Sequence, residues 1–217
     1  MSRRWVVAAR KLAATTAHTA LSASPAWAHA RVIASSPAEG SVVSSLPSAR
    51  LTFNESVSGT SSALRVLTSS GATLSGPARV SGSSVTAPVR SINAGRYALV
   101  YRVTSADGHV IANSIGFSVR LSDPPSSATT VRLSGESVGM SGTRVGTRSL
   151  KLKGELRRAI GQVTWRLPGF PEPFEWSLAK GKARGMLPFP GTYSVTVTAY
   201  SSASSVRTLT GVIRIAP

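Results

Sequence analysis

The sequence holds very few side chains that could bind a metal ion or act on a substrate. Its 217 residues include no cysteine and three histidines, which are His18, His29 and His109. Without cysteine the chain has no disulfide framework, no thiolate zinc site and no thiol nucleophile. Any chemistry that needs an imidazole must therefore use one of these three histidines.

One of them, His109, stands beside a carboxylate. Asp107, Gly108 and His109 directly follow an expected strand, and residues i and i+2 of an extended chain point to the same side. Asp107 and His109 can therefore converge on one point, while Gly108 leaves the backbone free to turn. Loop histidines and turn aspartates are also common where nothing is bound, so the pair alone leaves a metal site and a plain surface loop both open.

The amino terminus has the three parts of a secretory signal. Basic residues open the chain, a small and weakly apolar stretch follows, and Ala26-Trp27-Ala28 closes it. Ser2-Arg3-Arg4 followed by an apolar segment resembles a twin-arginine signal. We therefore expect residues 1–28 to be a signal peptide that is removed on export, so that the mature chain begins with His29.

Cleavage at this place would change what His29 can do. Its freed α-amine and its imidazole could then bind one metal ion as a chelating pair. With Asp107 and His109 they form a set of nitrogen and oxygen donors that suits Cu(II) in a tetragonal site. Zinc also accepts such donors, although structural zinc sites usually show cysteine or more histidine.

The elements that must position these residues are strands. Apolar and polar residues alternate from Arg31 to Leu121, and Gly, Asn and Ser mark the turns. About seven strands over about 90 residues predict a β-sandwich for residues 29–121.

The remainder of the chain repeats this pattern after a break. Serine and proline mark residues 122–130 as a linker, and alternation resumes beyond it. We expect an all-β chain in which residues 131–217 form a second small β-sandwich-like domain. Gly95-Arg96-Tyr97 and Gly191-Thr192-Tyr193 stand at the start of comparable strands, where a tyrosine often ties the corner of a sandwich.

Residues 29 to about 120 resemble the CopC-type copper-binding family. The motifs that carry the resemblance, in order, are His29-Ala30, Ser35-Ser36-Pro37-Ala38-Glu39-Gly40, Leu51-Thr52-Phe53-Asn54-Glu55, Gly95-Arg96-Tyr97 and Val103-Thr104-Ser105-Ala106-Asp107-Gly108-His109. The resemblance implies an extracytoplasmic immunoglobulin-like sandwich that binds Cu(II) in copper tolerance or uptake. It also implies a membrane partner of the CopD copper-transporter type.

The same resemblance assigns residue roles. The Cu(II) ligands of the family fall on His29, Asp107 and His109, with one Cu(II) per chain. Glu55 matches an acidic residue of the family and is expected to hydrogen-bond behind the ligands. The methionine-rich Cu(I) site of some members is not expected, because Met1, Met140 and Met186 all lie outside the matching segment.

The chain is strongly basic, with 25 Lys and Arg against 8 Asp and Glu and a formal charge of +17. Nucleic acid is not the expected partner, because the chain is exported and its arginines are spread rather than clustered with aromatic residues. The second domain holds many of the basic residues and no histidine. It either docks on an anionic envelope or membrane surface or simply presents a solvated basic face.

We therefore expect a Cu(II) carrier or chelator of copper homeostasis or resistance, exported to the periplasm, the cell envelope or the exterior, and not an enzyme. One alternative is a copper-dependent oxidative enzyme of the lytic polysaccharide monooxygenase type, which also uses an amino-terminal histidine but needs an open coordination position. Another is a structural module that binds the cell envelope and has no specific affinity for copper.

Overall fold

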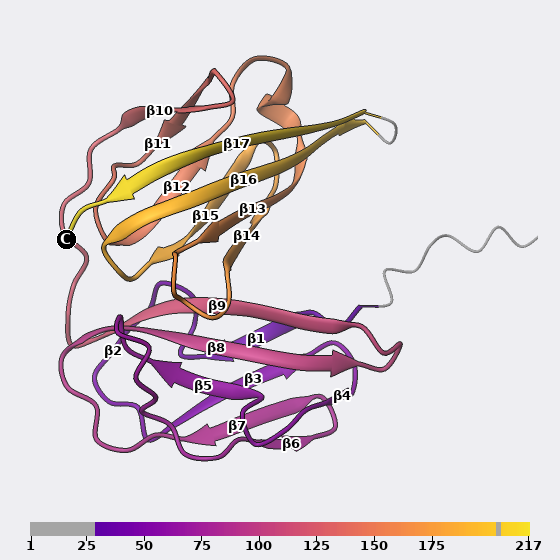
Figure 1. The fold of residues 1–217 in the computed structure, drawn as a ribbon, viewed down its shortest axis with the longest axis vertical. Helices are drawn as coiled ribbons and strands as arrows, with labels where there is room; N and C mark the ends of the chain where they lie inside the picture. Colours follow the sequence, from indigo (N-terminus) through magenta and orange to yellow (C-terminus); the bar gives the residue numbers. More distant parts are fainter. Residues whose placement is uncertain (1–28, 203–204) are drawn as a thin grey trace, which may run out of the picture.

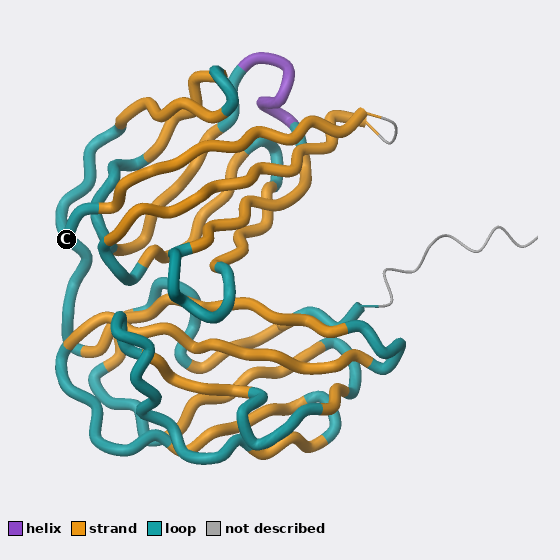
Figure 2. Tube along the Cα trace, in the orientation of Figure 1, coloured by secondary structure: helices purple, strands orange, loops and turns teal. Residues whose placement is uncertain are grey.

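The computed structural model describes residues 29–202 and 205–217 (Figure 1). Strands make up most of this part, and its single helical segment is the 3-10 turn η1 (Gly154–Arg158) (Figure 2). The all-β prediction is confirmed. Among the described helical residues nothing is long and apolar enough to cross a membrane. The expected signal peptide, residues 1–28, lies outside the described residues.

The first half forms a sandwich of two sheets. Its strands are β1 (Val32–Ser36), β2 (Val42–Val43), β3 (Ser48–Phe53), β4 (Val57–Ser58), β5 (Leu64–Leu67), β6 (Arg79–Ser81), β7 (Ser84–Pro88), β8 (Gly95–Ser105) and β9 (Val110–Val119). One sheet has the order β1-β3-β7-β6, and in the other β8 and β9 pair with each other and with β2, β4 and β5. This gives nine strands where about seven were expected, because pieces of two or three residues are too short to show alternation.

The core of this sandwich is built from the residues that alternate in the sequence. Leu51 and Phe53 of β3 meet Leu99 of β8 and Phe117 of β9, and all four are buried. The neighbouring residues on each strand face away from this core. The period of two therefore sets which side chains the two sheets share, and the predicted β-sandwich is confirmed.

The second half is again two packed sheets. Its strands are β10 (Thr129–Leu133), β11 (Glu136–Met140), β12 (Gly146–Lys151), β13 (Ile160–Arg166), β14 (Phe174–Leu178), β15 (Lys182–Leu187), β16 (Gly191–Ser202) and β17 (Ser205–Ile215). The first sheet has the order β10-β11-β12-β15, and the second contains β14-β13-β16-β17. The aromatic residues Trp165, Phe174, Phe189 and Tyr193 fill the space between them.

The two halves share a sheet, which the sequence did not show. β14 pairs in parallel with β9 at Phe174 and Ser114, so a nine-stranded sheet runs from β17 to β4. Ala98 and Val100 of β8 pack into the core of the second half. In the stretch expected to be a linker, Asp123 accepts a hydrogen bond of 2.7 Å from the backbone N–H of Thr147, and β10 begins two residues earlier than expected. The domain limits drawn from the sequence stay a prediction.

A tyrosine closes the corner of each half in the same way. The Tyr97 hydroxyl donates to the carbonyl of Asn93 at 3.0 Å, and the Tyr193 hydroxyl donates to the carbonyl of Phe189 at 2.9 Å. Both bonds span four residues, as the repeated Gly-x-Tyr motif indicated. Tyr193 is fully buried, whereas Tyr97 keeps a small exposed fraction.

We expect Tyr193→Phe to destabilise the fold by about 1–3 kcal/mol, because it leaves a buried carbonyl without its donor. Tyr97→Phe should cost less, since water can reach the carbonyl of Asn93 more easily. The measurement is the free energy of unfolding from urea titration of both variants. Equal losses for the two variants would mean that burial does not set the strength of these bonds.

Candidate metal centre

The turn between β8 and β9 presents two of the expected ligands. Ser105 ends β8, Val110 begins β9, and the Ser105 N–H donates to the carbonyl of His109 at 2.9 Å. Gly108 lies at a φ of 85°, where a side chain would be strained. The glycine thus lets the chain reverse within four residues, and Asp107 and His109 stand at the tip of the hairpin.

The Asp107 carboxylate is oriented by its own turn. The Ser105 hydroxyl and the His109 backbone N–H, the latter at 3.2 Å, both donate to Oδ1. The Ser105 hydrogen bond is the main reason that the pKa of Asp107 lies well below its usual range; the donors of His109 and His29 lower it further. The group is therefore ionised throughout the neutral range, and its second oxygen, Oδ2, is left for other partners.

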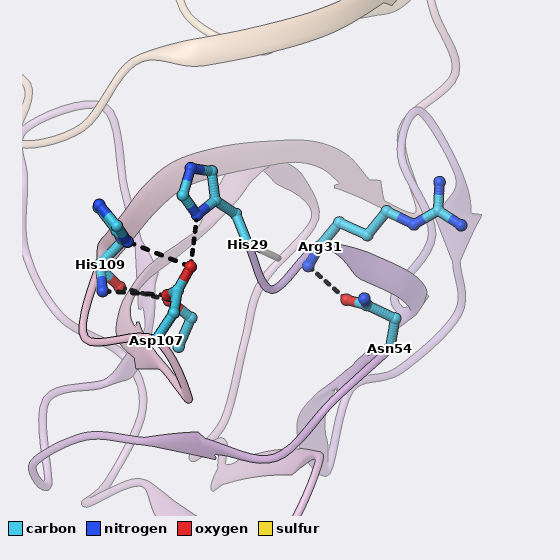
Figure 3. Close-up of polar contacts among 6 residues, drawn as sticks. His29, Arg31, Asn54, Asp107 and His109 are labelled. Carbon is cyan, nitrogen blue, oxygen red and sulfur yellow. Dashed lines mark hydrogen bonds and ion pairs between the residues drawn. The ribbon is translucent and has the colours of Figure 1, made fainter. Parts of the chain in front are cut away.

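Both expected histidines meet this second oxygen (Figure 3). His29 Nδ1 lies 2.8 Å and His109 Nδ1 lies 3.1 Å from Asp107 Oδ2. The centres of the two imidazole rings are 4.4 Å apart, and one potential ligand atom from each of the three residues lies within 4.8 Å of the others. The structure thus brings together all three of the ligands expected from the sequence. All are exposed at one end of the sandwich.

His29 reaches this place because the chain just after it is fixed. The Arg31 N–H donates to the side-chain oxygen of Asn54 at 2.6 Å (Figure 3). The Asn54 N–H donates in turn to the carbonyl of Arg31 at 3.1 Å. Ala30, between His29 and this clamp, is 3% exposed and belongs to the core. Two hydrogen bonds and one buried methyl group therefore hold His29 beside a turn that is 78 residues away in the sequence.

Sequence reasoning did not single out Asn54 or Ser105. Asn54 directly follows the strand that ends at Phe53, a place where an Asn side chain often hydrogen-bonds to nearby backbone. The sequence therefore did contain an indication of its role. Ser105 stands two residues before Asp107. Many serines in turns have such a spacing to an acidic residue, so the spacing alone does not identify Ser105 as a partner of Asp107. Their partners become visible only when the strands are in register.

Glu55 was expected to bond behind the ligands. It lies between β3 and β4, directly after the Asn54 clamp. Its Oε1 is buried and has no hydrogen-bond partner among the described residues. A buried carboxylate oxygen without a donor is unusual. A supporting role for Glu55 toward a ligand remains a prediction.

Two imidazole nitrogens and one carboxylate oxygen form a compact donor set of intermediate softness. Imidazole suits copper and zinc, and a set without sulfur favours neither Cu(I) nor a structural zinc site. The ligand atoms are already close together in the metal-free protein because Asp107 hydrogen-bonds to both rings. Such an arrangement can bind one divalent ion of the copper type with little rearrangement.

The comparisons with known proteins agree with this reading. The family model of the CopC domain matches residues 32–120. Residues 32–120 are thus a CopC domain, of the copper-binding and copper-resistance family, and the resemblance noted in the sequence is confirmed. The matched segment contains Asp107 and His109 and begins three residues after His29.

Two solved structures show partial similarity. CopC from Methylosinus trichosporium OB3b is 24% identical over 44% of this chain and 98% of its own, with a TM-score of 0.38. Dimeric latent PorU from Porphyromonas gingivalis is 9% identical over 86% of this chain and 20% of its own, with a TM-score of 0.27. No curated protein matches this chain.

Replacing the Ser105 hydroxyl tests how Asp107 is held. In Ser105→Ala we expect the pKa of Asp107 to rise toward its usual range, because the hydrogen bond that lowers it most is lost. The measurement is an NMR titration of the Asp107 carboxyl carbon in the metal-free protein. Ser58→Ala, which removes a hydroxyl bonded to Thr104 on the same β8 strand, is the matched control and should leave the pKa of Asp107 unchanged.

Proposed function

We propose that this protein binds one Cu(II) ion per chain through His29, Asp107 and His109, and carries or chelates copper outside the cytoplasm in copper homeostasis or resistance. The observation that carries the proposal is the convergence of His29 and His109 on Asp107, whose Oδ2 lies 2.8 and 3.1 Å from their Nδ1 atoms. The CopC domain at residues 32–120 supports copper as the metal.

Metal binding in this site is a competition with protons. Imidazole and carboxylate ligands must lose their protons to bind a metal. Ser105 and the His109 N–H already keep Asp107 ionised, so protons compete with copper at the two imidazoles. Copper affinity therefore falls as the solution becomes more acidic.

Processing of the amino terminus completes the site in this proposal. Removal of residues 1–28 would convert the peptide nitrogen of His29 into an α-amine. A peptide nitrogen is planar, with its lone pair delocalised, whereas an amine can donate to copper. The protein would then acquire full affinity only after export to the periplasm, the envelope or the exterior.

A carrier fits this donor set better than an oxidative enzyme. Asp107 stands between the two imidazoles, so its anionic oxygen would occupy a position next to the metal that an oxygen-activating site must keep open. An anionic oxygen donor also stabilises Cu(II) against reduction. A polysaccharide monooxygenase would need an open coordination position and a copper ion that is more easily reduced. We therefore propose that the protein is not an enzyme.

The proposal also includes a membrane partner and a division of the chain into domains. Copper would pass to or from a membrane transporter of the CopD type, and nucleic acid is not a partner. We propose residues 29–121 as the copper-binding domain, with 122–130 as its linker and 131–217 as a basic β domain. The parallel pairing of β9 and β14 at Ser114 and Phe174 supports close packing of these two domains.

The amine contribution can be tested with three preparations: the chain starting at His29, the same chain with Gly-Ser added before His29, and His29→Ala. We expect the Gly-Ser form to bind Cu(II) at least about 10–100-fold more weakly than the chain starting at His29, because it loses a direct donor. His29→Ala should bind more weakly still. The measurement is a competition titration against a chelator of known affinity.

Equal affinity for the first two preparations would exclude the amine as a ligand. Equal affinity for all three would remove His29 from the site and end the copper proposal at this place. Asn54→Ala extends the test, since it keeps every ligand but releases the clamp on Arg31, and should weaken binding less than His29→Ala.

Spectroscopy should show a single Cu(II) centre with nitrogen and oxygen donors. The chain has no cysteine, so electron paramagnetic resonance should give a type-2 spectrum, and titration should saturate at one equivalent. A second tightly bound equivalent would show that another site exists. Peroxide production or chitin cleavage with ascorbate would favour the monooxygenase alternative.

A further inference from the structure

The second half carries an exposed apolar row near the tip of the β16–β17 hairpin. Ile160 of β13 pairs with Tyr200 of β16, and Tyr200 pairs with Val206 of β17. Directly paired residues of antiparallel strands lie on the same face of a sheet. The three side chains are 62%, 38% and 53% exposed, so they form one apolar row at the outer end of the sheet.

Cationic side chains adjoin this row. Arg157 and Arg158 end η1, which runs directly into β13 and Ile160. Lys180 lies in the turn between β14 and β15, and the N–H of its neighbour Gly181 donates to the carbonyl of Ala159 at 2.8 Å. Arg157, Arg158 and Lys180 are all exposed, so a basic rim lies next to the apolar row.

This basic rim is not neutralised within the described part of the chain. The ion pairs found there between arginine and a carboxylate are Arg102 with Glu172 and Arg207 with Glu136, and neither involves Arg157, Arg158 or Lys180. The one carboxylate of η1 itself is Glu155. The excess positive charge at this end is therefore turned toward solvent.

The charge continues onto the neighbouring sheet. Lys151 of β12 stands directly opposite Lys182 of β15, and Arg184 follows on the same face, opposite Ser149. Like charges placed directly across from each other destabilise a strand pair. These cations lie on the outward face of the opposing sheet, so they add to the positive charge of this half without belonging to the basic rim.

We propose that this end of the protein docks on an anionic lipid bilayer. The apolar row of Ile160, Tyr200 and Val206 enters the boundary between headgroups and acyl chains, and the rim of Arg157, Arg158 and Lys180 binds lipid phosphates. Apolar side chains beside Lys and Arg are the combination that holds peripheral proteins at such surfaces. Tyrosine is itself enriched at this depth of a membrane.

Charge and polarity together favour an anionic bilayer over other partners for this end of the protein. A soluble anionic polymer would satisfy the cations and leave the apolar row in water. A second copy of this chain would cover the row but bring two basic rims together. A bilayer with acidic headgroups satisfies both features at once.

Docking would also orient the copper site. In Figure 1 the C-terminal end of β16, the N-terminal end of β17 and the β8–β9 turn, which carries Asp107 and His109, lie on the same side of the molecule. A bilayer that receives the hairpin end would thus lie on the side where His29 and His109 are exposed. The docking itself requires no copper, so its test is independent of the proposed copper function.

The experiment uses the chain starting at His29, without metal, and measures co-sedimentation with vesicles. We expect binding to vesicles of phosphatidylcholine mixed with phosphatidylglycerol, little binding to pure phosphatidylcholine, and weakening by salt. Each lost cation should reduce the partition coefficient about fivefold, so the double variant Arg157→Gln/Arg158→Gln should lose more than tenfold. Val206→Ser, or Ile160→Ser if the first variant folds poorly, should lose several-fold.

Matched controls lie elsewhere on the protein. Val212→Ser changes a residue that is 67% exposed on the same strand β17, away from the hairpin tip, and Arg79→Gln/Arg214→Gln removes two exposed cations outside the rim. Both should bind vesicles as the unchanged protein does. The proposal is overturned if the controls lose as much as the test variants, or if Val206→Ser and Ile160→Ser fold and bind normally.

Two further results would point to a binding partner other than a bilayer. Binding to soluble polyphosphate but not to vesicles, with no effect of the apolar variants, would assign the rim to an anionic polymer. A concentration-dependent dimer in sedimentation velocity that Ile160→Ser abolishes would assign the row to a second copy. Either result would overturn docking on a bilayer.

Discussion

The antiparallel register of β8 and β9 is the constraint on which the other parts depend. It runs from Gly95 opposite Val119 to Thr104 opposite Val110, so the turn that it leaves must present Asp107 and His109. The same register places Ser114 at the middle of β9, where β14 joins and extends the sheet into the second half. One hairpin thus determines the position of Asp107 and His109 and the attachment of the second half.

The ligand cluster combines firm anchoring with exposure. Ala30 is buried and Arg31 is bonded twice to Asn54, yet the imidazole of His29 lies in solvent beside Asp107. Because the backbone is fixed and the side chains are accessible, an ion can enter and leave without opening the core. That combination suits a protein that passes a metal on, whereas a structural metal site is usually enclosed by the fold that it stabilises.

The second half contributes a different kind of surface. Its interior is an aromatic core around Trp165 and Tyr193, and its exterior carries many exposed Lys and Arg side chains. Since Ala98 and Val100 of β8 are part of that core, the two halves cannot easily turn relative to each other. A surface that orients the second half would therefore also orient His29, Asp107 and His109 of the first.

The alternation of apolar and polar residues was sufficient to predict the strands and the sandwich class, because both depend on a period of two, and the repeated Gly-x-Tyr triplet pointed to the two tyrosine corners. Residue type and scarcity drew attention to His29, Asp107 and His109, and the resemblance to the CopC family assigned them as the expected ligands. Tertiary structure alone decided that Asn54 clamps Arg31, that Ser105 holds Asp107, that β9 and β14 share a sheet, and that Ile160, Tyr200 and Val206 form one row. Each of these depends on the register between strands distant in sequence, and register is set by packing of the whole core rather than by any local pattern.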